Sequence, residues 1–120
     1  LSGACMLLRR QMLADIGPLD EAFFMYIEDV DICYRAHQGG YGVVYFPQAV
    51  VTHHIGRSSD TLPSRSILQW HRSMWRYYRK HMGSNPLVDG LTLAGIGARC
   101  GYQLVLQNGR RLLAGRRRSS

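Results

Sequence analysis

The stretch from Phe23 to Arg35, FFMYIEDVDICYR, constrains the fold of this chain more than any other part of its sequence. Three acidic residues follow its aromatic run within four positions: Glu28, Asp29 and Asp31. Acids in a first turn complement the helix dipole, and Asp31 stands one turn before Arg35, at the spacing of an i,i+4 ion pair. The stretch therefore predicts a helix over residues 28–38, which Gly39 and Gly40 end.

Shorter elements are predicted on either side of this helix. Residues 9–16 have the pattern of a short helix that a Gly-Pro pair closes. Apolar residues predict a buried strand at 1–8. The β-branched and aromatic runs at 41–46 and 49–52, which Pro47 separates, predict two short strands or one broken strand. The expected fold class is therefore α/β with a small sheet, followed by α-helical C-terminal segments.

Residues 63–83 predict an amphipathic helix. Apolar and aromatic residues recur there at helical spacing: Ile67, Trp70, Met74, Tyr77, Tyr78 and Met82. Basic residues fall largely on the other face: Arg72, Arg76, Arg79 and Lys80. The aromatic face is most simply a packing surface, and the alternative is that it lies in a membrane interface.

Residues 87–106 form an apolar segment rich in small residues, with Gly97 and Gly101 at GxxxG spacing. Asp89 and Arg99 interrupt this segment. Because a charged side chain costs about 2.5–3.5 kcal/mol near a bilayer centre, a membrane-spanning helix is disfavoured. A basic tail follows, made of Arg110, Arg111 and Arg116 to Arg118.

The chain has 120 residues, enough for one small domain with a core, and begins at an apolar leucine. We expect a fragment of a longer protein, organised as residues 1–60, 61–83 and 84–120. No signal-peptide pattern opens it. The three cysteines are odd in number and set among apolar residues, which predicts reduced thiols in the cytoplasm and neither a disulfide framework nor a zinc site.

The net charge of +7 is unevenly distributed. Residues 1–60 carry four basic and seven acidic side chains, a net −3, whereas residues 61–120 carry eleven basic and one acidic, a net +10. An acidic half is suited to holding a cation. A basic half is suited to phosphate, nucleic acid or an anionic membrane surface.

A carboxylate poised as a base and a histidine able to bind a metal are two halves of one kind of active site. Asp29 and Glu28 supply the first, and His53, in the run VVTHHIGRSS, supplies the second. The polar, glycine-containing loop after His53 would let backbone approach a ligand. Structural alternatives stay open: the acids complement the helix dipole, Asp31 pairs with Arg35, and His53 is a surface or core histidine.

The first half of the chain carries a series of motifs in a fixed order. They are Gly3-Ala4, Arg9-Arg10, Gly17-x-Leu19-Asp20-Glu21, Phe23-Phe24, Glu28-Asp29-x-Asp31, Arg35, Gly40-Tyr41, Pro47-x-Ala49 and His53. Together they resemble the C-terminal half of the catalytic domain of family 2 glycosyltransferases, which have the GT-A fold. The chain looks most like the bacterial rhamnosyltransferase-like enzymes of cell-wall and polysaccharide synthesis. The resemblance covers residues 2–59, weakens over the following helix and nearly vanishes after it.

The resemblance implies roles for several of these residues. Asp29 corresponds to the general base that takes the proton of the acceptor hydroxyl, and Glu28 would orient that base or contact the acceptor. His53 would complete the coordination of Mg²⁺ or Mn²⁺ at the leaving nucleoside diphosphate. Three further residues are assigned to substrate binding, the first two beside the donor sugar: Gly3, Ala4 and Asp31.

The implied reaction is inverting transfer of a sugar, with rhamnose as the candidate, from a nucleotide-sugar donor to a glycan or lipid-linked acceptor. The family binds its nucleotide through an N-terminal Rossmann-like half ending in an Asp-x-Asp metal motif. Asp29-Val30-Asp31 has those letters but stands in the acid-base position. We therefore expect the 120-residue chain to be inactive alone.

Two other classes of function remain for the basic half. A nucleic-acid-binding module would use arginines and aromatic residues together, but here they fall on opposite helical faces, so nucleic acid is not an expected partner. A membrane-surface module would dock residues 70–80 and the arginine tail on anionic lipid. That reading is compatible with a lipid-linked acceptor, and it predicts a cytoplasmic protein peripheral to the membrane's cytoplasmic face.

Overall fold

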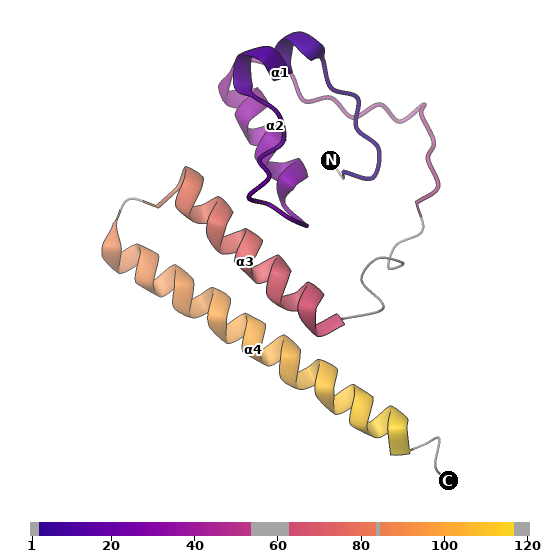
Figure 1. The fold of residues 1–120 in the computed structure, drawn as a ribbon, viewed down its shortest axis with the longest axis vertical. Helices are drawn as coiled ribbons and strands as arrows, with labels where there is room; N and C mark the ends of the chain where they lie inside the picture. The colour runs from indigo at the N-terminus through magenta and orange to yellow at the C-terminus, as the bar shows by residue number, and fades with distance from the viewer. Residues whose placement is uncertain (1–2, 54–62, 84, 117–120) are drawn as a thin grey trace. The chain divides into compact units, whose positions relative to one another are not determined.

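The structure, a computed structural model, describes residues 3–53, 63–83 and 85–116. Four helices follow one another along the chain (Figure 1): α1 Arg10–Ile16, α2 Glu28–Gln38, α3 Pro63–His81 and α4 Pro86–Arg116. The chain divides into two compact units, Leu1–Ile55 with α1 and α2, and Gly56–Ser120 with α3 and α4. The predicted three-part division stays a prediction.

The predicted strands are the main correction that the structure makes to the expected fold. No strand forms in the described residues 3–53, so the predictions at 1–8, 41–46 and 49–52 are wrong there, and the α/β class is not confirmed. A strand is stable only when a neighbouring strand completes its hydrogen bonds. The apolar side chains of these segments are largely exposed, as Val44, Phe46 and Val50 illustrate at 75%, 63% and 89% exposure.

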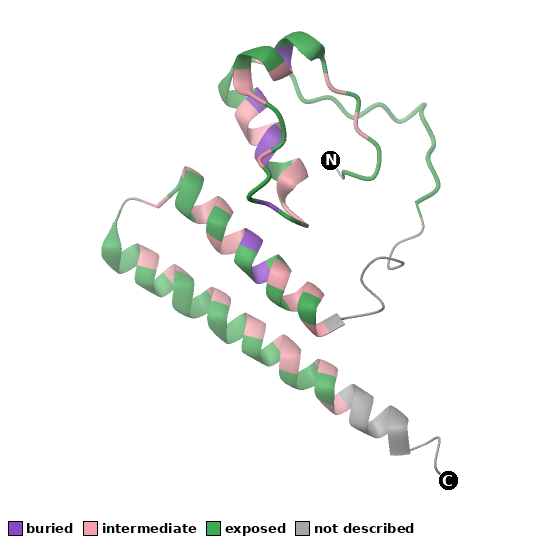
Figure 2. Ribbon diagram, viewed as in Figure 1, coloured by how far each residue is buried: buried purple, intermediate pink, exposed green. Residues whose placement is uncertain are grey.

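The first unit has a small core between its two helices. Met12 of α1 packs with Ile32 and Ala36 of α2, and all three are buried. Figure 2 shows that most of the ribbon of this unit is exposed or intermediate. Five partly buried side chains surround them: Met6, Leu8, Leu13, Ile16 and Tyr41. Because this apolar core is small, polar contacts carry much of the connection between α1 and α2.

Arg35 of α2 is the strongest of these polar contacts. Its Nε donates to Asp31 Oδ2 at 2.8 Å, and the Asp31 side chain is 0% exposed. Its Nη1 donates to the carbonyl of Ile16 at 2.7 Å, and its Nη2 donates to the carbonyl of Pro18 at 2.8 Å. The Arg35 guanidinium therefore supplies hydrogen-bond donors both to a buried carboxylate and to the carbonyl groups at the end of α1.

The predicted end of α2 at the Gly39-Gly40 pair is confirmed. Gly40 has a φ of +81°, and its amide and that of Tyr41 donate to the carbonyls of His37 and Ala36 at 3.1 and 2.9 Å. This pattern is a Schellman motif, which needs a residue in the left-handed region. Gly39 packs so close to α1 that an added Cβ would lie 2.8 Å from Ile16 Cγ2.

Tyr41 ties the chain after α2 back to α1. Its hydroxyl donates a hydrogen bond to Asp15 Oδ2. This hydrogen bond raises the pKa of Tyr41, and burial and the negative charge of Asp15 raise it further, while Arg9 lowers it. The contact adds a third connection between the two helices of the first unit.

The second unit is an antiparallel helical hairpin in which α3 and α4 lie side by side (Figure 1). Asn85 caps α4, because its Oδ1 accepts hydrogen bonds from the amides of Leu87 and Val88 at 3.0 and 3.4 Å. Asp89 of α4 joins the helices. It accepts a 2.9 Å hydrogen bond from the Tyr78 hydroxyl and forms an ion pair with Arg79. The aromatic face of α3 is thus a packing face, at least at Tyr78.

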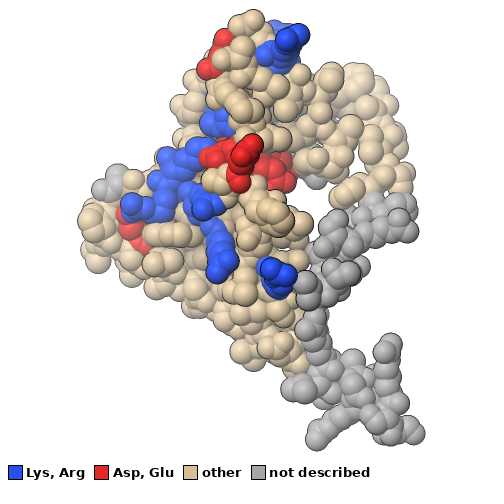
Figure 3. Space-filling model, in the orientation of Figure 1, with Lys and Arg blue, Asp and Glu red and all other residues tan. Residues whose placement is uncertain are grey.

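In the part of the chain that the structure describes, α3 carries most of the exposed basic side chains. Figure 3 shows lysine and arginine side chains gathered over this helix. The exposed basic residues of α3 are Arg65, Arg72, Arg76, Arg79 and Lys80. No described helix is both long enough and apolar enough to cross a membrane.

The Arg35 contact makes a direct prediction about stability. In Arg35→Met the 0% exposed Asp31 side chain loses its guanidinium, and breaking a buried ion pair from one side costs about 3 kcal/mol. Amide hydrogen exchange in α1 and α2 should therefore accelerate by about 100-fold relative to the unchanged chain. Arg10→Met, which removes an exposed arginine of α1, is the control and should exchange at the unchanged rate. Equal protection in the two variants would show that Arg35 does not hold the unit together.

Candidate active site

The two neighbouring acids Glu28 and Asp29 open α2, as the sequence predicts. The two residues before them, Tyr26 and Ile27, have φ values of 68° and 72°. This left-handed conformation is rare for any side chain and rarer for a β-branched one, at about 1–3 kcal/mol per residue. The carbonyl of Ile27 then accepts the Asp31 amide at 2.8 Å and starts the helix. A strained turn therefore sets the direction in which the acid pair leaves the backbone.

Both carboxylate oxygens of Asp29 are held by backbone amides. Oδ2 accepts a 2.8 Å hydrogen bond from Gly3, 26 positions earlier in the chain, and Oδ1 accepts one of 2.8 Å from Val30. The approach is close: a Cβ at Gly3 would lie 3.3 Å from Asp29 Cβ and 3.5 Å from Oδ2. Each carboxylate oxygen can still accept a further hydrogen bond. The Asp29 carboxylate is therefore fixed in place and chemically available.

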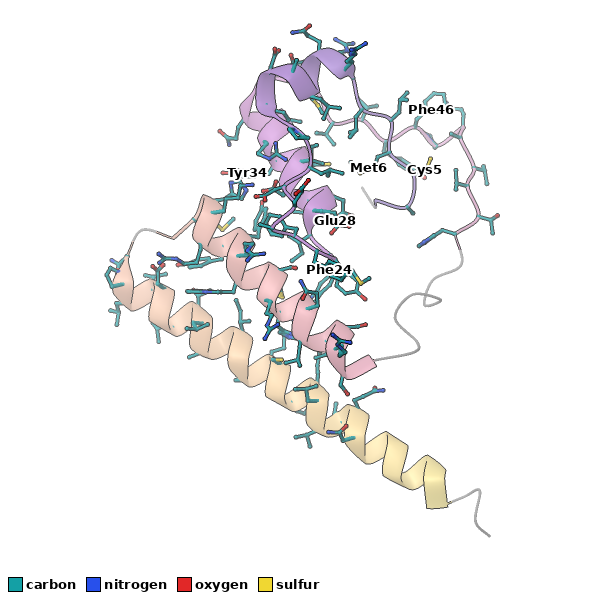
Figure 4. All side chains as sticks on the ribbon, in the orientation of Figure 1. Cys5, Met6, Phe24, Glu28, Tyr34 and Phe46 are labelled. Atoms are coloured by element: carbon teal, nitrogen blue, oxygen red, sulfur yellow. The ribbon has the colours of Figure 1, made fainter. Side chains whose placement is uncertain are left out.

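Glu28 contributes a different kind of carboxylate. It lies at the start of α2 (Figure 4) and is partly buried. Its Oε2 atom is buried and has no hydrogen-bond partner within the part of the chain that the structure describes. Buried polar atoms without partners are rare in folded proteins, and they are explained best by a ligand or a catalytic role.

The other residues predicted to bind substrate lie differently. Gly3 contacts Asp29, and the exposed Ala4 follows it. Asp31 is buried on the packed side of α2, where Arg35 engages its Oδ2. The structure thus gives Asp31 the ion pair that its spacing from Arg35 predicts. The substrate-binding roles of these residues stay predictions.

His53 is exposed, in a segment without regular secondary structure. Within the described residues, no hydrogen bond or ion pair joins it to Glu28 or Asp29, and no three His, Cys, Asp or Glu side chains gather as a metal site. Mg²⁺ prefers oxygen ligands in an octahedral arrangement, which one imidazole does not supply. The described residues therefore do not by themselves fit a metal ion. His54 lies outside them.

Two features of this site are not predicted above from the sequence. The strained backbone at Tyr26 and Ile27 is invisible to propensity, because neither residue type favours a positive φ. The hydrogen bond from Gly3 to Asp29 joins residues far apart in the chain. The small residue at position 3 was the available signal for a close approach, although we expected it to face the donor sugar.

Comparison with known proteins gives the family context of these residues. Residues 1–75 match the family model described as "Glycosyltransferase like family 2". N-acetylglucosaminyl-diphospho-decaprenol L-rhamnosyltransferase of Mycobacterium tuberculosis is 38% identical over 84 residues, which are 69% of this chain and 27% of that protein. Rhamnosyltransferase WbbL of Escherichia coli is 30% identical over 93 residues, 76% of this chain and 35% of that protein.

A third match is shorter. A low-salt glycan biosynthesis hexosyltransferase of Haloferax volcanii is 44% identical over 36 residues, 30% of this chain and 12% of that protein. No solved structure matches the chain significantly. The aligned part of this chain spans 27% and 35% of the two rhamnosyltransferases, about a third of their length or less.

The contact between Gly3 and Asp29 can be tested by NMR. Because the Gly3 amide donates to Asp29 Oδ2, its hydrogen should exchange with solvent more slowly than that of an amide without a partner. In Asp29→Ala the acceptor is lost, so exchange at Gly3 should accelerate by about tenfold. The Ala22 amide, which donates to Asp20 Oδ1 at 2.9 Å, is the internal control and should exchange equally in both proteins. Equal exchange at Gly3 in the two proteins would rule the contact out.

Proposed function

Because the chain belongs to glycosyltransferase family 2, we propose that it forms the acceptor-binding and catalytic half of a longer, inverting glycosyltransferase with the GT-A fold. The named relatives support rhamnose as the sugar and a lipid-linked saccharide as the acceptor, as in the M. tuberculosis enzyme's name. A nucleotide-sugar would be the donor. The observation that carries the proposal is the acid pair at the start of α2, with Asp29 fixed by Gly3.

The proposed reaction is one direct displacement. The acceptor hydroxyl attacks the anomeric carbon of the donor sugar, and its proton passes to the carboxylate of Asp29. The bond between the anomeric carbon and the diphosphate oxygen breaks, and the electron pair leaves with the diphosphate. Amide hydrogen bonds hold Asp29 in position without using all its lone pairs, which suits a general base.

Glu28 has a separate part in this proposal. Its buried Oε2 has no partner among the described side chains and backbone groups, so it keeps an unused acceptor that a sugar hydroxyl would satisfy once the groups that cover it move aside. A hydroxyl bound in this way would lie at the first turn of α2, which also carries Asp29. Glu28 therefore binds and orients the acceptor, whereas Asp29 takes the proton.

Family 2 glycosyltransferases generally depend on a divalent metal ion. We propose that His53 supplies one ligand to Mg²⁺ or Mn²⁺ and that oxygen ligands come from outside the described residues, since these hold no metal site of their own. No step of the reaction above is assigned to the ion.

The GT-A fold and the cellular location are parts of the same proposal. Residues 3–8 and 41–53 are extended or irregular and expose apolar side chains, which would be covered if these segments paired with strands of the rest of the catalytic domain. The free thiols of Cys5, Cys33 and Cys100 are compatible with a cytoplasmic enzyme. A lipid-linked acceptor would bring that enzyme to the cytoplasmic face of a membrane.

The role of Asp29 is tested by kinetics in the full-length enzyme. Asp29→Asn keeps the shape of the side chain but cannot accept the proton, so kcat should fall by about 100- to 10,000-fold while donor binding changes little. Glu21→Gln, which neutralises an exposed carboxylate of the same unit, is the control and should leave kcat unchanged. Normal turnover by Asp29→Asn would eliminate Asp29 as the base.

The role of His53 is tested by metal titration in the same enzyme. Loss of one ligand weakens metal binding, so His53→Ala should raise the Mn²⁺ concentration needed for half-maximal activity by about tenfold or more. His54→Ala changes the neighbouring imidazole and should titrate like the unchanged enzyme. If both variants need the same amount of Mn²⁺, His53 is not the ligand.

A further inference from the structure

The side of α4 that faces away from α3 is apolar along most of its length. Asp89 and Gln103 mark the side that faces α3, because Asp89 binds Tyr78 and Gln103 lines a small pocket with Ile67. The opposite side carries residues at spacings of three or four: Leu87, Leu91, Ala94, Ala98, Tyr102 and Val105. This spacing places them in one stripe, about 27 Å long at 1.5 Å per residue.

This stripe, which we call the outer face of α4, is exposed. Leu87, Leu91, Tyr102 and Val105 are 73%, 68%, 65% and 71% exposed, and both alanines are exposed as well. Figure 2 shows the exposed residues along α4. None of the stripe residues is charged, and Arg99 lies beside the stripe rather than in it. A continuous apolar surface of this length is typical of a binding site.

The positive charge of this part of the chain indicates which partner covers the outer face of α4. Residues 61–120 carry eleven basic side chains and one acidic one, a net +10. Asp89, the one acid, is paired with Arg79. A second copy of the chain would bring another +10 to this surface and be repelled. An anionic lipid bilayer offers both an apolar layer for the outer face and negative headgroups for the arginines.

We propose that α4 docks in the plane of an anionic membrane surface through its outer face. The helix lies on the bilayer and does not cross it, in keeping with the absence of a membrane-spanning helix from the described chain. Arg99, at the edge of the stripe, reaches the phosphate layer, and basic residues continue to the end of α4 at Arg116. This assignment differs from the sequence-based one, which used α3, because Tyr78 of α3 is engaged by α4.

The proposal does not depend on the proposed enzymatic activity, and the 120-residue chain itself is the sample for its test. The chain is sedimented with phosphatidylcholine vesicles and with vesicles that also contain phosphatidylglycerol. It should bind the anionic vesicles at low salt. Binding should weaken by about tenfold or more at roughly 0.5 M salt, where the Debye length falls to a few ångströms.

Variants distinguish the contribution of the apolar outer face to vesicle binding from that of the net charge. Leu91→Glu with Val105→Glu should weaken binding by about tenfold or more, because two apolar side chains no longer leave water. Gln38→Glu with Gln48→Glu is the matched control: it lowers the net charge equally, from +7 to +5, at exposed positions of the first unit, and should stay bound. Leu91→Ser with Val105→Ser keeps the net charge at +7 and should also lose binding.

Three results would overturn the proposal. The first is a chain that stays in the supernatant with anionic vesicles at low salt. The second is equal vesicle binding by the unchanged chain and both Leu91 and Val105 double variants, each shown to be helical by circular dichroism. The third is self-association without lipid, measured by analytical ultracentrifugation and abolished by the same double variants, which would make the outer face an interface between copies.

Discussion

The guanidinium of Arg35 is the interaction on which the arrangement of α1 and α2 depends. It neutralises Asp31, which is 0% exposed at its side chain, and it binds the carbonyls of Ile16 and Pro18 where α1 ends. Apolar packing between these helices is limited to a few side chains around Ile32. A buried carboxylate is stable only with such a partner, so the ion pair between Asp31 and Arg35 and the packing of α2 against α1 depend on each other.

The ion pair between Asp31 and Arg35 also fixes the first turn of α2, which carries the candidate acids. Asp31 comes two residues after Asp29 and one after Val30, so anchoring Asp31 on the packed side directs these two residues to other sides of the helix. The strained backbone at Ile27 and the hydrogen bond from Gly3 then fix Asp29 from the other end. Carboxylates held by packing and backbone contacts need little rearrangement before a reaction.

Local sequence signals predicted the helices well. The acids of the first turn and the Gly39-Gly40 pair predicted both ends of α2, because capping is decided by neighbouring residues. The strands were wrong for the described residues, because pairing depends on segments far away in the chain or outside it. The same limit applies to contacts between elements: Asp89, taken from the sequence as an interruption of an apolar segment, joins α3 to α4 through Tyr78 and Arg79.

For the candidate site, the sequence predicted the residue types and the motif order, and the family match over residues 1–75 agrees with them. The geometry around Asp29 came from the structure, since a carboxylate in a first turn has the same sequence pattern whether it serves a helix dipole or a reaction. The central proposal is that Asp29 acts as a base in a single displacement. The anomeric configuration of the product, measured by ¹H NMR with a nucleotide-activated rhamnose donor and the full-length enzyme, tests it most directly. The account predicts a configuration opposite to that of the donor, and a retained configuration would contradict it.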